Sequence, residues 1–177
     1  MKYCSHCGAR VTSRIPQGDD RPRFVCDTCQ TIHYENPRIV VGCIPEFGDS
    51  ILLCRRAIQP SYGKWTLPAG YLENGETLLE ATKRETFEEA KARLTAVTPY
   101  AVFNLTFVNQ VYVMFRGCLV DQDYGPGAES SDVKLLSEHD IPWEDLAFSV
   151  IRETLRLYVA DRRRGLFPFH MGDVGPR

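Results

Sequence analysis

Three glutamates lie close together in the sequence, at a spacing that is suited to binding a cation. Glu85, Glu88 and Glu89 occupy positions i, i+3 and i+4, which share one face of an α-helix with Cβ atoms about 5–6 Å apart. At an effective dielectric constant of about 20, each pair of such carboxylates repels by about 3 kcal/mol. A bound Mg²⁺ or Mn²⁺ would offset that repulsion, because both ions prefer oxygen ligands. The alternative is a solvated acidic helix face, which is the usual fate of a charge run.

A second group of candidate ligands is formed by four cysteines near the N-terminus. Cys4 and Cys7 form one Cys-x-x-Cys pair, Cys26 and Cys29 form another, and 18 residues separate the pairs. Four thiolates at this spacing can close a tetrahedron around Zn²⁺ at about 2.3 Å each, and such a closed site is structural because it leaves no position for a substrate. The pattern resembles a zinc ribbon. Disulfides or free thiols are the alternatives, and an intracellular setting disfavours the disulfides.

The length and composition indicate one domain with a small appendage. The chain has 177 residues, a formal net charge of -2, 44% hydrophobic and 25% charged residues, all ordinary values for a globular protein. This charge does not favour nucleic acid as a partner. No run approaches the roughly 20 apolar residues of a membrane helix, and no apolar segment follows Lys2 as in a signal peptide. We therefore expect a cytoplasmic protein with a zinc ribbon at residues 1–33 and a main domain at residues 34–177.

The elements that must position the glutamates are strands and two helices. Glu, Ala, Leu, Lys and Arg dominate residues 77–92, where Gly and Pro are absent, so this segment is predicted as a helix. A second helix is predicted over residues 149–164, with Gly165 as its stop. Runs rich in Val, Ile, Tyr and Phe predict strands; they cover residues 39–44, 51–55, 97–105 and 110–120, with a further short strand after the acidic loop of residues 121–132. The Gly48-Asp49 turn predicts that the first two strands form a hairpin, and residues 65–67 are a short apolar run. These elements indicate a mixed α/β (α+β) domain.

The surroundings of the glutamates resemble the signature of the Nudix family. Its fixed glycine, arginine and glutamates are matched at the required spacing by Gly70, Glu76, Arg84, Glu85, Glu88 and Glu89. Two positions depart from the pattern: Thr86 replaces an aliphatic residue, and Lys91 replaces the final glycine. Because a glycine normally ends the helix there, we expect the helix to run past Lys91. The similarity extends over about residues 34–165.

This resemblance implies a fold, a reaction and residue roles. The fold is an α/β/α sandwich with a mixed sheet, and the enzyme is a pyrophosphohydrolase that uses Mg²⁺ or Mn²⁺. Glu85, Glu88 and Glu89 would bind the metal with the carbonyl of Gly70, and the catalytic set would also include Arg84 and Glu76. Arg84 would pair with Glu76 and hold the preceding loop against the helix. Glu89 is one candidate for the general base.

A later loop supplies the other candidate base, Glu129, for which the alternative is a plain solvated loop residue. The segment from Phe103 to Leu105 and the following strand look closest to short Nudix enzymes that act on FAD or ADP-ribose, so the expected substrate is an ADP-X compound. An NADH or NAD pyrophosphatase is the alternative, although the Ser-Gln-Pro-Trp-Pro-Phe-Pro-like motif of that class is absent. Candidates for stacking on a base are Phe103, Phe107 and Tyr112, with a place in the core as the alternative. Candidates for binding phosphate are Arg38, Arg55, Arg56 and Lys64, with a solvated surface position as the alternative.

Two other functional classes are weighed against the enzyme. A nucleic-acid-binding zinc ribbon would need a basic face, but acidic residues interrupt its arginines. A regulator that binds a nucleotide without cutting it is disfavoured by the intact set of three glutamates. The partner is therefore expected to be a nucleotide-derived small molecule, and the resemblance adds a homodimer as a candidate assembly.

Overall fold

The computed structural model describes residues 1–176, and the chain forms two compact units that divide after Pro37. The first unit is a small antiparallel sheet, in which β2 (Arg23–Cys26) pairs with both β1 (Val11–Arg14) and β3 (Ile32–His33). Its buried apolar residues are few: Cys4, Val25 and Cys26. A core this small cannot hold three short strands by itself, so a cross-link or metal is needed.

The second unit is built around a mixed sheet of eight strands. The main strands run in the order β10 (Ser130–Ser137), β5 (Ser50–Arg56), β4 (Arg38–Phe47), β9 (Gln110–Leu119), β8 (Leu94–Leu105) and β11 (His170–Asp173). The short strands β6 (Trp65–Thr66) and β7 (Ala69–Tyr71) pair with β5 and β4. The β4–β9 and β11–β8 pairs are parallel and the others are antiparallel. The sheet is thus mixed, as predicted.

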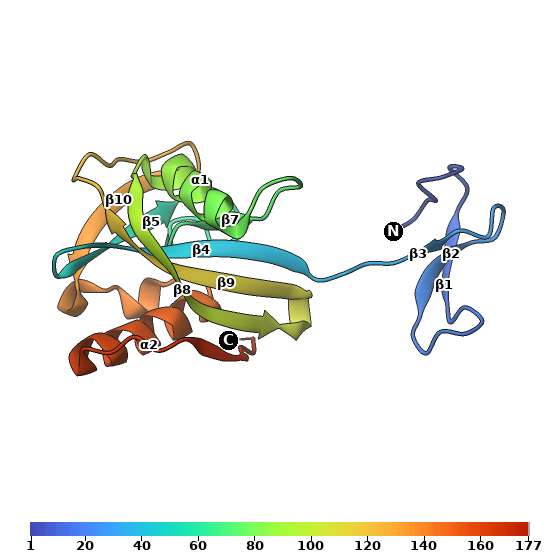
Figure 1. The fold of residues 1–177 in the computed structure, drawn as a ribbon. Coiled ribbons are helices and arrows are strands. Elements are labelled where there is room, and N and C mark those ends of the chain that lie inside the picture. Colours follow the sequence, from blue (N-terminus) through green and yellow to red (C-terminus); the bar gives the residue numbers. More distant parts are fainter. Residues whose placement is uncertain (177) are drawn as a thin grey trace. The chain divides into compact units, whose positions relative to one another are not determined.

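Two helices cover opposite faces of this sheet (Figure 1), which confirms the expected α/β/α sandwich. Helix α1 (Leu78–Ala90) lies on one face and α2 (Ser149–Arg164) on the other. Alternate side chains of β5 point to opposite faces of the sheet. Both sets are buried, because a helix covers each face (Figure 1). Ile51 and Leu53 join the core beneath α2, while Leu52 and Cys54 join the core beside α1.

The second helix and the first hairpin agree with the sequence patterns. Helix α2 spans Ser149–Arg164, and Gly165 follows it in the left-handed conformation at φ 67°. Strands β4 and β5 form the expected hairpin around Gly48 and Asp49. Short 3₁₀ helices occur at Thr106–Val108, Glu138–Asp140 and Trp143–Asp145. Within the described residues, neither helix has the length and apolar character needed to cross a membrane.

The prediction for the end of the first helix was wrong. We expected a helix over residues 77–92 that continues past Lys91, but α1 ends at Ala90 and Lys91 takes a left-handed φ of 54°. The reason is tertiary: Gly127 and Gly125 donate backbone hydrogen bonds to the carbonyls of Glu89 and Ala90, at 2.9 and 2.8 Å. These bonds satisfy carbonyls that another helical turn would otherwise occupy.

Candidate active site

The three glutamates of helix α1 differ in their exposure to solvent. Its first turn is fixed by a capping box, in which the Thr77 hydroxyl accepts from the Glu80 amide and the Glu80 carboxylate accepts from the Thr77 amide. The Glu88 side chain is 56% exposed and that of Glu85 is 12% exposed, whereas residue Glu89 is only 7% exposed. The carboxylates therefore run from solvent into the interior along one helix face.

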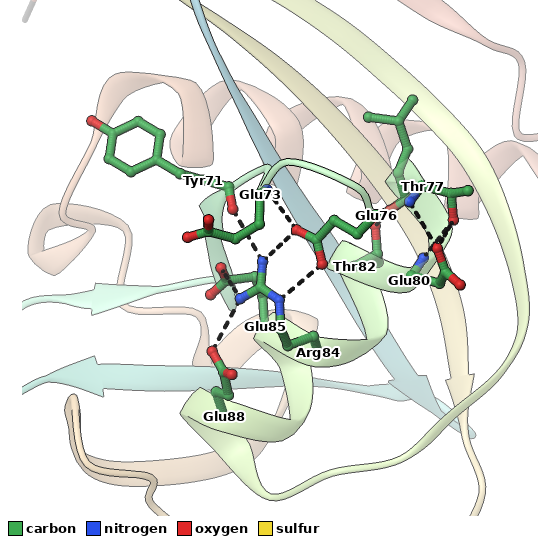
Figure 2. Close-up of polar contacts among 10 residues, drawn as sticks. Tyr71, Glu73, Glu76, Thr77, Glu80, Thr82, Arg84, Glu85 and Glu88 are labelled. Carbon is green, nitrogen blue, oxygen red and sulfur yellow. Dashed lines mark hydrogen bonds and ion pairs between the residues drawn. The ribbon is translucent and has the colours of Figure 1, made fainter.

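The guanidinium of Arg84 joins the preceding loop to this face (Figure 2). It donates to both oxygens of Glu76, at 3.0 and 2.7 Å, and to the Tyr71 carbonyl at 3.1 Å. It also donates to Glu85 at 2.7 Å and to Glu88 at 3.1 Å. The pair with Glu76 is the one that the family resemblance implied, and the hydrogen bond from Arg84 lowers the pKa of Glu76.

Glu89 is a buried carboxylate with an unmet hydrogen-bonding requirement. Its Oε2 atom is the one buried side-chain oxygen or nitrogen without a partner among the described residues. Burial, and then the negative charge of Glu85, raise the pKa of Glu89 to about 8. Burial also raises the pKa of Glu85. Arg84 beside Glu85 and Arg56 near Glu89 favour the ionised forms but do not offset the burial, so a further positive charge would stabilise both carboxylates.

The donor set around Glu89 fits a hard divalent cation. Glu85, Glu88 and Glu89 share one face of α1, one Glu89 oxygen is unpartnered, and Gly70 on β7 lies directly against the Glu85 carboxylate. A Cβ atom at Gly70 would come within 2.3 Å of the Glu85 carboxylate, so only glycine allows the β7 backbone to approach this closely. Oxygen donors of this kind are typical of Mg²⁺ or Mn²⁺ sites.

These carboxylates open on a cavity of about 890 Å³. Its polar side includes Gly70, Arg84, Glu85, Glu88, Glu89 and Glu129. Its apolar and aromatic side includes Val40, Ile58, Leu105, Phe107, Tyr112 and Phe148. The volume is in the usual range for sites that bind small molecules. A ligand that carries both anionic and flat apolar parts fits such a two-sided cavity.

The cavity brings together some of the predicted substrate-binding residues and not others. Tyr112 lines it, as do Phe107 and Arg56. Phe103 is 2% exposed and belongs to the core beneath α2, away from the lining. Arg55 donates to the Gly63 carbonyl at 2.9 Å and does not line the cavity.

Two further basic residues from the sequence analysis are engaged elsewhere. Arg38 packs its guanidinium 5.6 Å from the Tyr71 ring centroid and is not part of the cavity lining. Lys64 forms an ion pair with Asp145 at 2.5 Å. Neither contact involves the three glutamates of α1.

Several lining residues are not among the candidates predicted from the sequence. Phe148 lies just before α2, and its ring centroid is 5.1 Å from the Arg56 guanidinium carbon. Gln110 donates to the Tyr71 hydroxyl at 2.9 Å, and both residues line the cavity. Each comes from a different element, and only the fold brings them to one place. The aromatic character of Phe148, next to a predicted helix start, is the one hint that the sequence offers.

The four cysteines of the first unit form a compact cluster. Their sulfur atoms all lie within 4.8 Å of one another. The Cys4–Cys29 pair is separated by 3.6 Å and the Cys7–Cys26 pair by 3.4 Å, close to the roughly 3.8 Å edge of a tetrahedral zinc–thiolate site. His33 Nε2 lies 3.3 Å from the Cys4 sulfur, so its ring is a neighbour of the cluster. The arrangement fits one zinc ion.

Comparisons with known families agree with this architecture. Residues 2–35 match the zinc-ribbon model described as "Nudix N-terminal", and residues 36–158 match the model described as "NUDIX domain". The second match alone covers more than half of the chain. The protein therefore belongs to the Nudix hydrolase family, with an N-terminal zinc ribbon.

Individual relatives are similar in sequence or in structure. A NUDIX hydrolase crystal structure from Nitrosomonas europaea is 51% identical, covers 99% of each chain and has a TM-score of 0.95. "NAD-capped RNA hydrolase NudC" of Vibrio atlanticus (strain LGP32) is 29% identical over 82% of this chain and 50% of its own length. The Schizosaccharomyces pombe "NAD-capped RNA hydrolase" is 28% identical over 94% of this chain and 45% of its own. The chain thus spans about half the length of the curated relatives it matches.

Proposed function

We propose that this Nudix hydrolase cuts the pyrophosphate bond of a nucleoside diphosphate derivative, with FAD and ADP-ribose as the leading ADP-X substrates. One observation carries the proposal: the carboxylate face of α1, with its unpartnered Glu89 oxygen, opens on a cavity whose other side is apolar and aromatic. A phosphate-rich group suits the first side, and a nucleobase or flavin ring suits the second. Phe107 and Tyr112 are the aromatic residues proposed to contact that ring.

The proposed residue roles are those that the family resemblance implies, and the lining of the cavity supports them. Glu85, Glu88 and Glu89, with the carbonyl of Gly70, would hold Mg²⁺ or Mn²⁺. When bound, such an ion neutralises pyrophosphate oxygens and makes water a stronger nucleophile at neutral pH. Arg84 orients the carboxylates through its hydrogen bonds to Glu85 and Glu88.

Arg56 is proposed to bind a phosphate oxygen of the substrate. It lines the cavity, and its Nε donates to the Pro60 carbonyl at 2.9 Å, which fixes the guanidinium in place. No ion pair to a carboxylate is found for Arg56 within the described part of the chain, so its charge is available to an anion. Glu89 and Glu129 are the candidates for the general base.

A second candidate function is hydrolysis of NAD, NADH or an NAD-capped RNA. Two similar proteins, from Vibrio atlanticus and Schizosaccharomyces pombe, favour it, since both are named as NAD-capped RNA hydrolases. These substrates contain the same pyrophosphate bond, so the chemistry on α1 would be unchanged. The cavity would then receive a nicotinamide riboside in place of the flavin half or the terminal ribose, and in an NAD-capped RNA the chain would continue from the adenosine side.

A substrate panel with Mg²⁺ or Mn²⁺ tests the proposal. FAD, ADP-ribose, NAD, NADH, an NAD-capped RNA, diadenosine polyphosphates and nucleoside triphosphates are compared by kcat/KM. We expect the highest value for FAD or ADP-ribose. A preference for NAD-capped RNA would establish the second candidate instead. If no compound is cut but one binds tightly, the protein is a nucleotide-binding regulator and the proposal is wrong.

The catalytic set is tested by Glu88→Gln. We expect kcat to fall by about a hundredfold or more, because one metal-binding charge is lost while the shape is kept. Thermal unfolding should be close to that of the wild type, since the Glu88 side chain is largely exposed. Undiminished turnover in both Glu88→Gln and Glu89→Gln would show that the metal site lies elsewhere.

A further inference from the structure

The loop between β9 and β10 is fastened to the C-terminal end of the glutamate-bearing helix. Gly127 donates its backbone N–H to the Glu89 carbonyl at 2.9 Å, and Gly125 donates to the Ala90 carbonyl at 2.8 Å. The last carbonyls of a helix have no partners within it, so they need donors from outside. Here the donors come from a loop that also reaches the cavity, because Ala128 and Glu129 belong to its lining.

Gly127 is the point of closest approach between this loop and α1. A Cβ atom at Gly127 would lie 1.6 Å from the Glu88 carbonyl oxygen, 2.7 Å from its carbonyl carbon and 3.1 Å from the Glu89 Cα. All three are backbone atoms of a regular helix, which cannot move aside as a side chain can. At Gly125, by contrast, an added Cβ would meet nothing within 4 Å. Of these two glycines, only Gly127 must lack a side chain for the loop to pack against α1 in this way.

This contact determines where Glu129 lies. Two residues after Gly127, the Glu129 carbonyl accepts a hydrogen bond from the Ala57 amide at 2.8 Å. The segment is thus fixed at α1 on one side and at the end of β5 on the other. The negative charge of Glu129 contributes to the raised pKa values of Glu85 and Glu89, so its carboxylate is electrostatically coupled to the metal-binding face. Across residues 1–176, no ion pair occupies the Glu129 carboxylate.

We propose that Gly127 is a positioning residue: its close contact with α1 holds Glu129 at the cavity wall, facing the proposed metal-binding carboxylates. This inference rests on the proposed function and on the role of Glu129 as general base. In that role a Glu129 oxygen takes a proton from water while the water oxygen bonds to phosphorus. The bond from that phosphorus to the bridging oxygen breaks, and its electron pair leaves with the departing phosphate.

The test compares Gly127→Ala with Gly125→Ala, which adds the same methyl group two residues away. Gly125→Ala keeps its N–H and has room, so we expect wild-type kcat and KM. Gly127→Ala should lower kcat by about a hundredfold, within the range for loss of a general base, with KM and Mn²⁺ affinity unchanged. Glu129→Gln should cause a similar loss, and the double variant should be no slower than either single variant.

An exchange measurement tests the same contact without any substrate. In Gly127→Ala the amides of residues 125 and 127 should exchange with solvent at least about tenfold faster than in the wild type, because their hydrogen bonds to α1 are broken. In Gly125→Ala they should stay protected. Unchanged exchange in Gly127→Ala would overturn the inference whether or not any substrate is cut. If the wild type cuts nothing in the panel, the proposed function falls separately.

Further variants cover the case in which Gly127→Ala does not fold. A glycine inserted between Ala128 and Glu129 leaves the Gly127 contact in place but moves the carboxylate, and it should lower kcat as Glu129→Gln does. Wild-type turnover in Glu129→Gln or in the insertion variant would overturn the inference. So would independent, multiplying losses in the double variant of Gly127 and Glu129, because they would show that Gly127 acts through something other than Glu129.

Discussion

Glu89 illustrates how one residue can favour function over stability. The fold buries it to 7% exposure and leaves its Oε2 without a partner. Its pKa rises from 4.5 in an unfolded chain to about 8. Between those pH values the unfolded chain ionises Glu89 while the folded protein keeps it protonated. The free energy of unfolding should therefore fall as pH rises from about 4.5 to about 8 when Mg²⁺ and Mn²⁺ are absent.

The substitution Glu89→Gln tests this reasoning. Without Mg²⁺ or Mn²⁺ at pH 8, the variant should be more stable than the wild type by about 1–3 kcal/mol, because only the wild type has a carboxyl group whose ionisation is opposed by burial. At pH 5 the difference should vanish, because Glu89 is then protonated and resembles glutamine. Chemical denaturation at both pH values measures this. A variant that is less stable at pH 8 would contradict the assignment.

Arg56 and Arg55 are adjacent on one strand but differ in environment, so they form a matched pair. We expect Arg56→Ala to lower kcat/KM by about 10- to 100-fold, mainly through KM, because a charged hydrogen bond to phosphate is lost. Arg55→Ala should stay within about twofold of the wild type, since this residue does not line the cavity. Steady-state kinetics on the best substrate of the panel measures both. Equal losses in the two variants would show that Arg56 has no special role.

At the scale of the element, α1 is delimited by two different mechanisms. Its start is local, because Thr77 and Glu80 form the capping box from the sequence of the first turn itself. Its end is imposed by the loop that binds the Glu89 and Ala90 carbonyls. The helix stops at the position where the family pattern has glycine, even though this chain has lysine there. Lys91 consequently adopts a backbone conformation that glycine adopts more easily.

Lys91→Gly should therefore stabilise the protein. Glycine removes the steric cost of a left-handed φ, and we expect a gain of about 0.5–1 kcal/mol in the free energy of unfolding. Lys91→Ala is the control, because it removes the long side chain but keeps a Cβ at the same φ of 54°. Urea denaturation of the two variants separates the effects. If alanine stabilises as much as glycine, the backbone conformation is not the cause.

At the scale of the whole molecule, the two compact units depend on different sources of stability. The unit from Arg38 onward has two apolar clusters on either side of its sheet. The unit Met1–Pro37 has three short strands and few buried apolar residues. The cysteine cluster links distant parts of this unit, since it joins Cys4 and Cys7 to Cys26 at the end of β2 and to Cys29 beyond it.

We predict one zinc ion per chain that remains after removal of Mg²⁺. Cys26→Ser should lose this zinc and unfold residues 1–37, because metal binding and folding are coupled in such small units. The remainder of the chain should keep its cooperative unfolding transition. Metal analysis and amide exchange of both units measure these outcomes. A zinc-free protein with a protected first unit would contradict the prediction.

The sequence determined the catalytic signature because its information is local. The spacing of Glu85, Glu88 and Glu89 fixes their common helix face through helical periodicity, and the two Cys-x-x-Cys pairs fix a metal-binding geometry through short loops. Helix α2 was predicted at its observed bounds for the same reason. Its apolar periodicity and the following glycine are both readable within 17 consecutive residues.

Only the tertiary structure decided what lies around the glutamates. Strand β11 has a short sequence with a glycine, and its place depends on pairing with β8 and on the 2.6 Å contact of His170 with buried Asp161. The choice of Arg56 over Arg55 for the cavity depends on strand register, which sets the face toward which each side chain points. The end of α1 and the position of Glu129 depend on a loop that contacts this helix, although the loop lies nearly 40 residues after it in the sequence. The class of chemistry could be predicted from the sequence because it rests on local spacing. Periodicity and spacing carry no information on long-range contacts, so the residues that surround the three glutamates became known only from the fold.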